Sequence, residues 1–168
     1  GLCLMSAVFV AGCGGGGGGG STTPSTSLGL VAGTPAPSTT SFAPSLTQVY
    51  SDTKLAVVPN EQLAITASGS FTYAPPPCVG CTETPDGKPW TTCVNLGPPA
   101  GPAYPAPGLP CWSLIGKIGA NGAPFEVGSN FSYTVPLGTS GELFLGVNDN
   151  FIQDNTGAWI VTIGVDGG

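Results

Sequence analysis

The segment AWIVTIGV, residues 158–165, determines the fold that we expect for this chain. Every second residue is large and apolar, so Trp159, Val161, Ile163 and Val165 share one face if the segment is extended. A helix would spread these four side chains around its circumference, whereas a strand places alternate side chains on the same side of a sheet. The segment therefore predicts a β-strand with one buried face.

The same period-two pattern recurs along the chain. Further strand candidates are VYSDTKLAVV (49–58), QLAITAS (62–68), GSFTYA (69–74), SLIGKIG (113–119), NFSYTVP (130–136) and ELFLGVN (142–148). Gly and Pro interrupt every apolar run, and the long charged side chains that helices favour are scarce. We expect an all-β fold, an antiparallel β-sandwich of two sheets with about seven to eight short strands. GTSGE, residues 138–142, is a candidate hairpin turn between two of these strands.

One long loop, about residues 74–112, interrupts the strand pattern and is rich in Pro, Gly and Cys. It contains Cys78, Cys81, Cys93 and Cys111. An even number of cysteines in an exported domain predicts two disulfides, and three pairings are open. A redox CxxC motif and a four-cysteine zinc site are the alternatives. Both are disfavoured, because the CxxC follows three prolines rather than opening a helix and because a zinc ribbon would show a second CxxC.

The N-terminal residues have the pattern of an export signal. Residues 2–10 form an apolar run of about the length of a signal-peptide core, and VAGC (10–13) resembles the lipobox of bacterial lipoprotein precursors. This resemblance implies a truncated signal peptide over residues 1–12, cleavage before Cys13 and lipid attached to Cys13. The alternative is an ordinary cysteine in an apolar leader. We expect a membrane-anchored lipoprotein, at the cell surface or facing the periplasm.

Composition separates a tether from a folded domain and excludes several function classes. Residues 13–45 are dominated by Gly, Ser, Thr and Pro after the lipidated cysteine, which predicts a flexible tether ahead of a domain over 46–168.

A net charge of -6 with three basic residues excludes nucleic-acid binding, and leaves the lipid as the membrane attachment. The chain has no histidine, which excludes Ser-His-Asp and Cys-His catalysis, and Glu126 and Glu142 show no spacing of an acid–base pair. We expect no enzyme activity.

Acidic and amide side chains concentrate in GVNDNFIQDNTGAW, residues 146–159, in a chain with only 7% charged residues. Asp149, Asp154 and Asn155 are short side chains that can bring oxygen atoms together over one point, as an oxygen-liganded cation such as Ca²⁺ requires. Asn and Asp are also ordinary turn residues, so a simple turn explains the same composition. The loop lacks the residue order of an EF-hand. From the residues alone, a turn and a calcium site both remain open.

Three segments together resemble a known family. GSFTYAP, LIGKIG and ELFLGVNDNFIQDNTGAWIVTIGV are similar to the bacterial PA-IL-like (galactophilic) lectins, and the resemblance extends from about Leu46 to Val165. Members are small β-sandwiches in which a calcium ion bridges the protein and a monosaccharide. The resemblance implies as calcium ligands the backbone carbonyl of Tyr73, the side chains of Asp149, Asp154 and Asn155, and the backbone carbonyl of Ile152 or Gln153.

The sugar contacts that the resemblance implies are Pro85, Asp86, Asp149 and Asn155. The chain departs from the family here: its calcium loop is about two residues shorter, Asp154 replaces an amide, and Thr84–Gly87 keeps only the Pro and Asp of the family's sugar-contact segment. Apolar candidates to cover a sugar are Trp90, Tyr104 and Trp112.

The function that follows is a lipid-anchored protein that binds an extracellular glycan or glycoconjugate through Ca²⁺, with galactose as one candidate sugar. The alternative is a non-catalytic structural or adhesive β-sandwich whose acidic loop is a turn or a purely structural calcium site. A homo-oligomer is left open.

Overall fold

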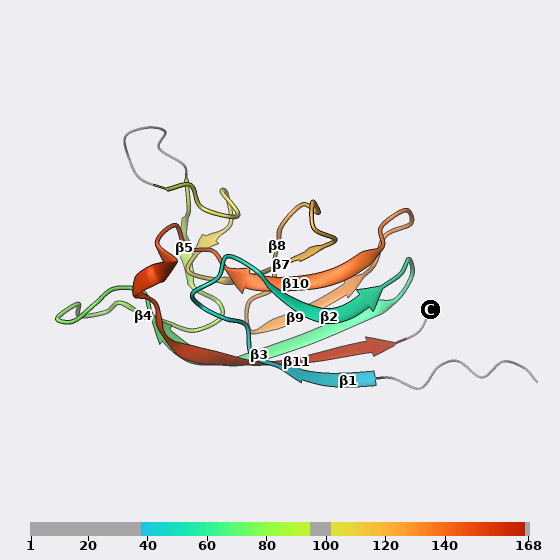
Figure 1. Cartoon of the computed structure of the whole chain (residues 1–168), viewed down its shortest axis with the longest axis horizontal. Coiled ribbons are helices and arrows are strands. Elements are labelled where there is room, and N and C mark those ends of the chain that lie inside the picture. Colours follow the sequence, from blue (N-terminus) through green and yellow to red (C-terminus); the bar gives the residue numbers. More distant parts are fainter. Residues whose placement is uncertain (1–37, 95–101, 167–168) are drawn as a thin grey trace, which may run out of the picture. The chain divides into compact units, whose positions relative to one another are not determined.

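The computed structural model describes residues 38–94 and 102–166, without the side chains of residues 89 and 90, and these residues form three antiparallel sheets (Figure 1). One sheet contains, in order, β1 (Ser38–Phe42), β11 (Thr156–Asp166), β3 (Gln62–Thr72) and β4 (Thr82–Glu83), with β9 (Asn130–Thr134) also paired to β3. The second contains β2 (Ser51–Val57), β10 (Gly141–Val147), β7 (Leu114–Ile118) and β8 (Phe125–Glu126). The third contains β5 (Lys88–Thr92) and β6 (Pro110–Cys111). The predicted all-β sandwich is confirmed.

Helical structure is nearly absent from these residues. The described part of the chain contains one short 3-10 turn, η1 (Ile152–Asp154), and no α-helix. Within it, no helix has the length and apolar character needed to cross a membrane.

The central pair of strands is β3 and β11. They pair over 11 residues, from Thr156 opposite Thr72 to Asp166 opposite Gln62. The four apolar side chains of 158–165 are all buried, as predicted, and they share one core cluster with the buried side chains of β10. Burial of alternate side chains from both sheets is what stabilises a sandwich, because each sheet covers the apolar face of the other.

Two predictions about the connections are wrong. Residues 62–68 and 69–74 do not form two strands, because the inward alternation of Leu63 and Ile65 continues to the buried Phe71 in β3. The turn at 138–142 is not a hairpin, because β9 and β10 lie in different sheets and the turn crosses between them. The loop 148–155 likewise joins β10 of one sheet to β11 of the other. Turn residues show that the chain reverses but not which sheet the next strand joins.

Part of the predicted tether belongs to the folded domain. Ser38–Phe42 lies inside the range 13–45 but forms β1, which pairs with β11 from Ser38 opposite Val165 to Phe42 opposite Val161. Its side chains are exposed except for the partly buried Phe42, which is why its composition resembles that of a linker. The leader, Cys13 and residues up to 37 lie outside the described part of the chain.

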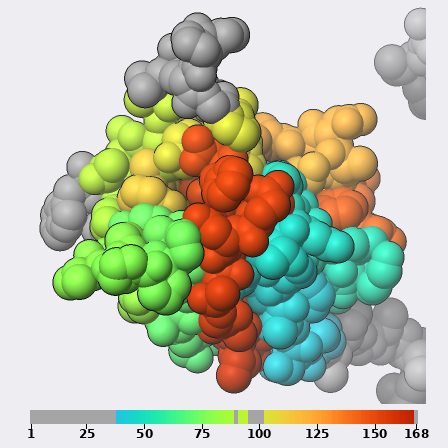
Figure 2. Space-filling view, turned by 60° about the vertical axis from the view of Figure 1, so that its left-hand side comes forward, coloured from blue at the N-terminus to red at the C-terminus, as the bar shows by residue number. Residues whose placement is uncertain are grey.

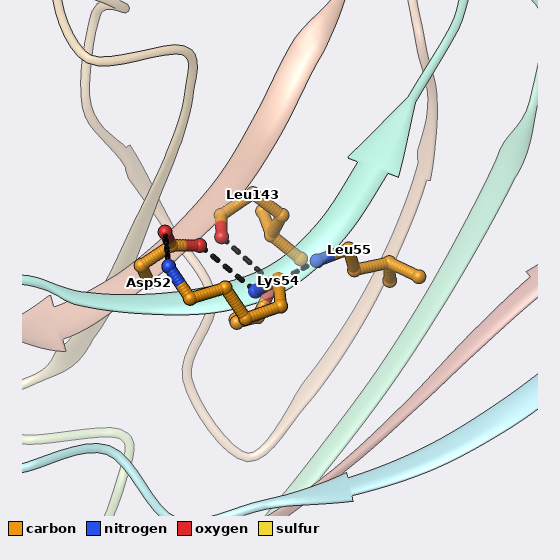
Figure 3. Close-up of polar contacts among 5 residues, drawn as sticks. Asp52, Lys54, Leu55 and Leu143 are labelled. Atoms are coloured by element: carbon orange, nitrogen blue, oxygen red, sulfur yellow. Dashed lines mark hydrogen bonds and ion pairs between the residues drawn. The ribbon is translucent and has the colours of Figure 1, made fainter.

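A bulge in β2 shows how the second sheet tolerates an irregular strand (Figure 3). The register with β10 shifts between Glu142 and Phe144, and Lys54 has a positive φ of 62°. The buried Thr53 hydroxyl donates to the Leu143 carbonyl at 2.8 Å and accepts from the Leu55 N–H at 3.2 Å. The threonine side chain therefore satisfies backbone groups that the bulge leaves outside the regular ladder.

The long loop is held by two disulfides, as predicted. Cys78 pairs with Cys81 and Cys93 pairs with Cys111, which is the local one of the three possible pairings. This pairing rules out a zinc site built from all four cysteines.

Gly157 is the second residue of β11, directly after the loop 148–155, and its backbone has a conformation that favours glycine. We expect Gly157→Ala to lower the free energy of unfolding by at least about 2 kcal/mol. Gly157 has a φ of 107°, and a Cβ there would lie 2.7 Å from the Ser70 carbonyl oxygen. Gly164→Ala, in the same strand, is the matched control, because its Cβ would meet the Ala64 oxygen at an ordinary 3.5 Å. Urea unfolding of both variants tests this, and equal losses would contradict it.

Candidate functional site

The loop 148–155 lies at one end of the sandwich, among segments that are distant in sequence. Figure 2 shows the C-terminal segment (red) on the surface between the green 70s segment, the cyan segment near residue 50 and the yellow segment after residue 102. Hydrogen bonds agree with the view. The Asn155 amide donates to the Leu46 carbonyl at 3.0 Å, and the Asn150 amide donates to the Pro102 carbonyl at 3.2 Å.

Three side-chain oxygens of this loop are buried without a hydrogen-bond donor. They are Asp149 Oδ2, Asp154 Oδ1 and Asn155 Oδ1, and none has a partner within the part of the chain that the structure describes. Asp149 and Asn155 are only 3% and 6% exposed. A buried acceptor without a partner costs about 1–3 kcal/mol, and more if it is charged. Three such oxygens in one loop therefore indicate a missing partner that supplies positive charge or several donors.

Local hydrogen bonds fix the direction of two of these oxygens. The Phe151 N–H donates to Asp149 Oδ1 at 3.1 Å, which leaves Oδ2 as the unpaired oxygen of that carboxylate. The Asn155 amide nitrogen donates to the Leu46 carbonyl. Because a carbonyl can only accept, the nitrogen must face Leu46 and the amide oxygen must point away from it. The loop therefore holds its free oxygens in place without help from a ligand.

The electrostatics of the loop favour a cation. Burial raises the pKa of the Asp149 carboxyl, and the nearby negative charge of Asp154 adds to this shift. Hydrogen bonds from the Phe151 N–H and the Asn155 side chain oppose it. Burial, and then the charge of Asp149, also raise the pKa of Tyr104, so this residue of the long loop lies near the site. A desolvated carboxylate next to a second carboxylate gains most from a bound positive charge.

Tyr73 lies beside the loop. The register of β3 and β11 ends with Thr72 opposite Thr156, so Tyr73 and Asn155 are the next residues along the two strands. The Tyr73 N–H donates to the Cys81 carbonyl at 3.0 Å, which holds the backbone at this point. The structure thus brings the predicted ligand residues Tyr73, Asp149, Asp154 and Asn155 to one end of the sandwich. Ile152 and Gln153, the two candidates for a carbonyl ligand, lie in η1 within the same loop.

The two remaining predicted sugar contacts have roles in the fold. Asp86 accepts hydrogen bonds from both the N–H and the hydroxyl of Ser129, each at 2.7 Å. Pro85 is buried, and its carbonyl accepts from the Leu114 N–H at 2.8 Å. No hydrogen bond among the described residues joins either of them to the free oxygens of the loop. These contacts join Asp86 to the residue before β9 and Pro85 to the first residue of β7.

Asn148 is a site residue whose role sequence reasoning missed. It is fully buried, and its amide nitrogen donates to the carbonyls of Ala106 and Pro110 at 3.0 Å each, with a longer contact to Leu109 at 3.3 Å. Its amide oxygen accepts from the Ala106 N–H at 3.0 Å. Asn148 therefore binds the end of the long loop to the acidic loop. The available signal was a polar residue directly after the buried strand ELFLGV.

Trp112 provides a partly exposed aromatic ring near the site. Its N–H donates to the Asn148 carbonyl at 2.8 Å, and its ring stacks on Tyr73 with centroids 4.1 Å apart. Its φ of 60° is unusual for a bulky residue, and such strain is concentrated at functional positions. The Lys88 ammonium lies 4.8 Å and 4.9 Å from the two ring centroids and bonds the Tyr73 hydroxyl at 2.6 Å. Because it is equally far from both stacked rings, Lys88 borders the stack rather than covering the outer face of Trp112.

The site contains too few strong ligands for a transition-metal centre. The described residues include no cluster of three or more His, Cys, Asp or Glu side chains. Two carboxylates, one amide and nearby backbone carbonyls form an oxygen-only donor set, which suits hard cations such as Ca²⁺.

Comparison with known proteins bears on the fold. No family model matches this sequence, and no curated protein matches it. Among solved structures, the chain is similar to one described as "EclA N-terminal domain; PllA-like lectin", with a TM-score of 0.52 and 19% identity over 76% of this chain and 95% of that one. The chain has a lectin-like fold. At this level of identity, the likeness concerns the architecture and does not extend to the ligand.

Proposed function

We propose that this chain is a carbohydrate-binding protein in which the loop 148–155 holds a calcium ion that takes part in sugar binding. The observation that carries the proposal is the set of buried oxygens without donors at Asp149, Asp154 and Asn155. The lectin-like fold and the resemblance of this loop to the PA-IL-like family support the same conclusion.

The donor set fits calcium. Asp149 Oδ2, Asp154 Oδ1 and Asn155 Oδ1 would be side-chain ligands, and the backbone carbonyls of Tyr73 and of Ile152 or Gln153 would complete the set. When bound, a calcium ion with open coordination positions accepts neighbouring sugar hydroxyls and fixes their geometry. The partly exposed Trp112 ring would then cover an apolar face of the sugar.

We also propose export, anchoring and absence of catalysis. The lipobox-like VAGC predicts a lipid on Cys13, with the domain at the cell surface or facing the periplasm. The two disulfides support export, since they persist in oxidising compartments. The lack of histidine supports a binding protein rather than a hydrolase of the Ser-His-Asp type.

The second candidate function is a structural calcium site without a sugar. The burial of Asp149 and Asn155 favours it, because an ion enclosed by the loop would stabilise the connection between the sheets without contacting a ligand. The two candidates differ in whether the ion has coordination positions open to solvent.

A glycan array probed with calcium and with chelator tests the proposed function. We expect glycans that bind in calcium and are lost in chelator. A calcium-dependent rise in the melting midpoint without any chelator-sensitive glycan would favour the structural site. If calcium neither raises the melting midpoint nor promotes binding to any glycan, the loop is only a turn.

The second carboxylate of the loop should strengthen calcium binding. We expect Asp154→Asn to weaken calcium about tenfold, because ligand charge sets the affinity of such sites and the change retains an oxygen of similar size. Isothermal titration with calcium measures this, and Asp166→Asn, on an exposed residue at the far end of β11, is the control. An unchanged affinity would place Asp154 outside the ligand set.

A further inference from the structure

The two disulfides of the long loop differ in their exposure to solvent. Cys78 lies in a run of exposed residues, 75–80, in which Val79 is 99% exposed. The other disulfide joins Cys93 and Cys111, which are only 1% and 4% exposed. Thiol–disulfide exchange begins when a thiolate attacks one sulfur, so its rate depends on access to that sulfur. An incoming thiol can therefore reach the first disulfide in the folded protein but not the second.

The exposed disulfide closes the tip of a loop that projects from the sandwich ahead of β4 (Figure 1). Gly80 at this tip has open space around it, because no described residue beyond its neighbours comes within 4 Å of the position of a Cβ there. Cys81, at the base of the tip, is only 7% exposed, and its carbonyl accepts from the Tyr73 N–H at 3.0 Å. The two cysteines are thus unequal, since Cys78 is open to a partner and Cys81 is covered and held by the sheet.

We propose that the Cys78–Cys81 disulfide is a site of thiol–disulfide exchange with dithiols, a role that does not depend on calcium or sugar binding. A thiolate of the dithiol bonds to the Cys78 sulfur, the Cys78–Cys81 bond breaks, and Cys81 leaves as a thiolate that takes up a proton. The second thiol of the partner then loses its proton and attacks the partner's own sulfur in the mixed disulfide, which releases Cys78. Two electrons pass to the protein, which ends with two thiols, and the dithiol ends as a disulfide.

A cation near the covered cysteine favours this direction of attack. The Lys88 ammonium donates to the Tyr73 hydroxyl at 2.6 Å, and that hydroxyl donates to the Gly80 carbonyl at 3.4 Å. The ammonium thus lies one hydroxyl away from the residue that precedes Cys81. An ion pair with Glu83 at 3.3 Å balances part of its charge. A nearby positive charge stabilises a thiolate, and a more stable thiolate leaves faster.

The sequence disfavours a redox CxxC because no helix opens at this motif. The structure provides two other features of a reactive pair, which are access to the first cysteine and a cation near the second. The cation takes the part that a helix N-terminus has in other redox motifs, because both favour the negative charge of a thiolate.

The test is partial reduction of the folded protein with dithiothreitol. Acid stops the exchange, a maleimide labels all free thiols in acidic denaturant, and peptide mapping assigns each label. We expect free thiols at Cys78 and Cys81 to appear at least about tenfold faster than at Cys93 and Cys111. Exchange into oxidised dithiothreitol should close the same pair again. If the four thiols appear together, or only after the protein is unfolded, the proposal is overturned.

Two matched variants test which sulfur is attacked. Cys81→Ser leaves Cys78 as a free thiol, and Cys78→Ser leaves Cys81. We expect Cys78 in the first variant to form a mixed disulfide with oxidised glutathione at least about tenfold faster than Cys81 in the second. Equal rates would contradict the assigned direction of attack. The reduction experiment uses the wild type, so it decides the proposal even if a variant does not fold.

The part assigned to Lys88 has its own control. Lys88→Gln should slow the reduction of the Cys78–Cys81 disulfide by dithiothreitol about threefold, and the difference should shrink in 1 M salt. Lys54→Gln should not change the rate, because Lys54 is an exposed residue of β2 whose ammonium pairs with Asp52. An unchanged rate in Lys88→Gln would contradict the assistance by this cation.

Discussion

Replacing Asn148 with Asp is expected to lower the free energy of unfolding by about 4 kcal/mol, because it turns a buried donor into a buried anion. The amide nitrogen donates to the carbonyls of Ala106 and Pro110. The introduced carboxylate would direct negative charge at these same carbonyls, with no cation among the groups that bind Asn148. Urea unfolding followed by tryptophan fluorescence measures the loss.

The matched control for this change is Asn121→Asp, because Asn121 is exposed and the chemical change is identical. The loss at Asn148 should also shrink near pH 4, at which an aspartate carboxyl in water is about half protonated. A loss below about 1 kcal/mol at pH 7 would show that the 106–110 segment does not depend on this amide.

Asp149→Asn is expected to abolish the response of the protein to calcium. If calcium at about 100 times its dissociation constant stabilises the native state by about 2.7 kcal/mol, the melting midpoint of the wild type rises by about 10 °C. The variant should show no rise, because it loses the charge of the proposed ligand Asp149. Differential scanning calorimetry with calcium and with chelator measures both midpoints, and Asp166→Asn should behave as the wild type.

The same variant has a characteristic pH dependence in chelator. Burial raises the pKa of Asp149 in the folded state above its value in the unfolded chain. Because this carboxyl holds its proton more tightly in the folded state, its contribution to the free energy of unfolding is fully present below the pKa of the unfolded state. The contribution is lost as the pH rises through the pKa of the folded state. The wild type should therefore gain stability relative to Asp149→Asn on acidification from pH 7 to 4. Parallel pH profiles for the two proteins would contradict the assigned burial of this carboxylate.

Sequence reasoning succeeded where the decisive information is local. The inward faces of β11 and β10 follow from alternation within seven to eleven residues, and one short loop between these two strands contains Asp149, Asp154 and Asn155. Sequence reasoning failed where a segment is structured only by contacts with residues that are distant in sequence. Ser38–Phe42 has the composition of a linker and becomes a strand only by pairing with residues 161–165.

The roles of two site residues depended on long-range contacts that composition does not reveal. Asn148 is one of several polar residues in the segment 146–159, but its bonding groups lie 38 to 42 residues away in sequence. Asp86 is a sugar contact that the resemblance implies, and the structure adds that both of its oxygens accept hydrogen bonds from Ser129, 43 residues away. In both cases, only the folded path of the long loop brings the partners together.

The antiparallel pairing of β1 with β11 sets the end of the sandwich at which the chain enters the first sheet. Ser38 lies opposite Val165, at the C-terminal end of β11, whereas the acidic loop precedes Thr156 at the other end (Figure 1). Eleven extended residues separate these ends by about 33 Å. The point at which the chain enters the sandwich and the oxygen cluster therefore lie at opposite ends of the same strand, so a bulky group joined at one end would not crowd the other.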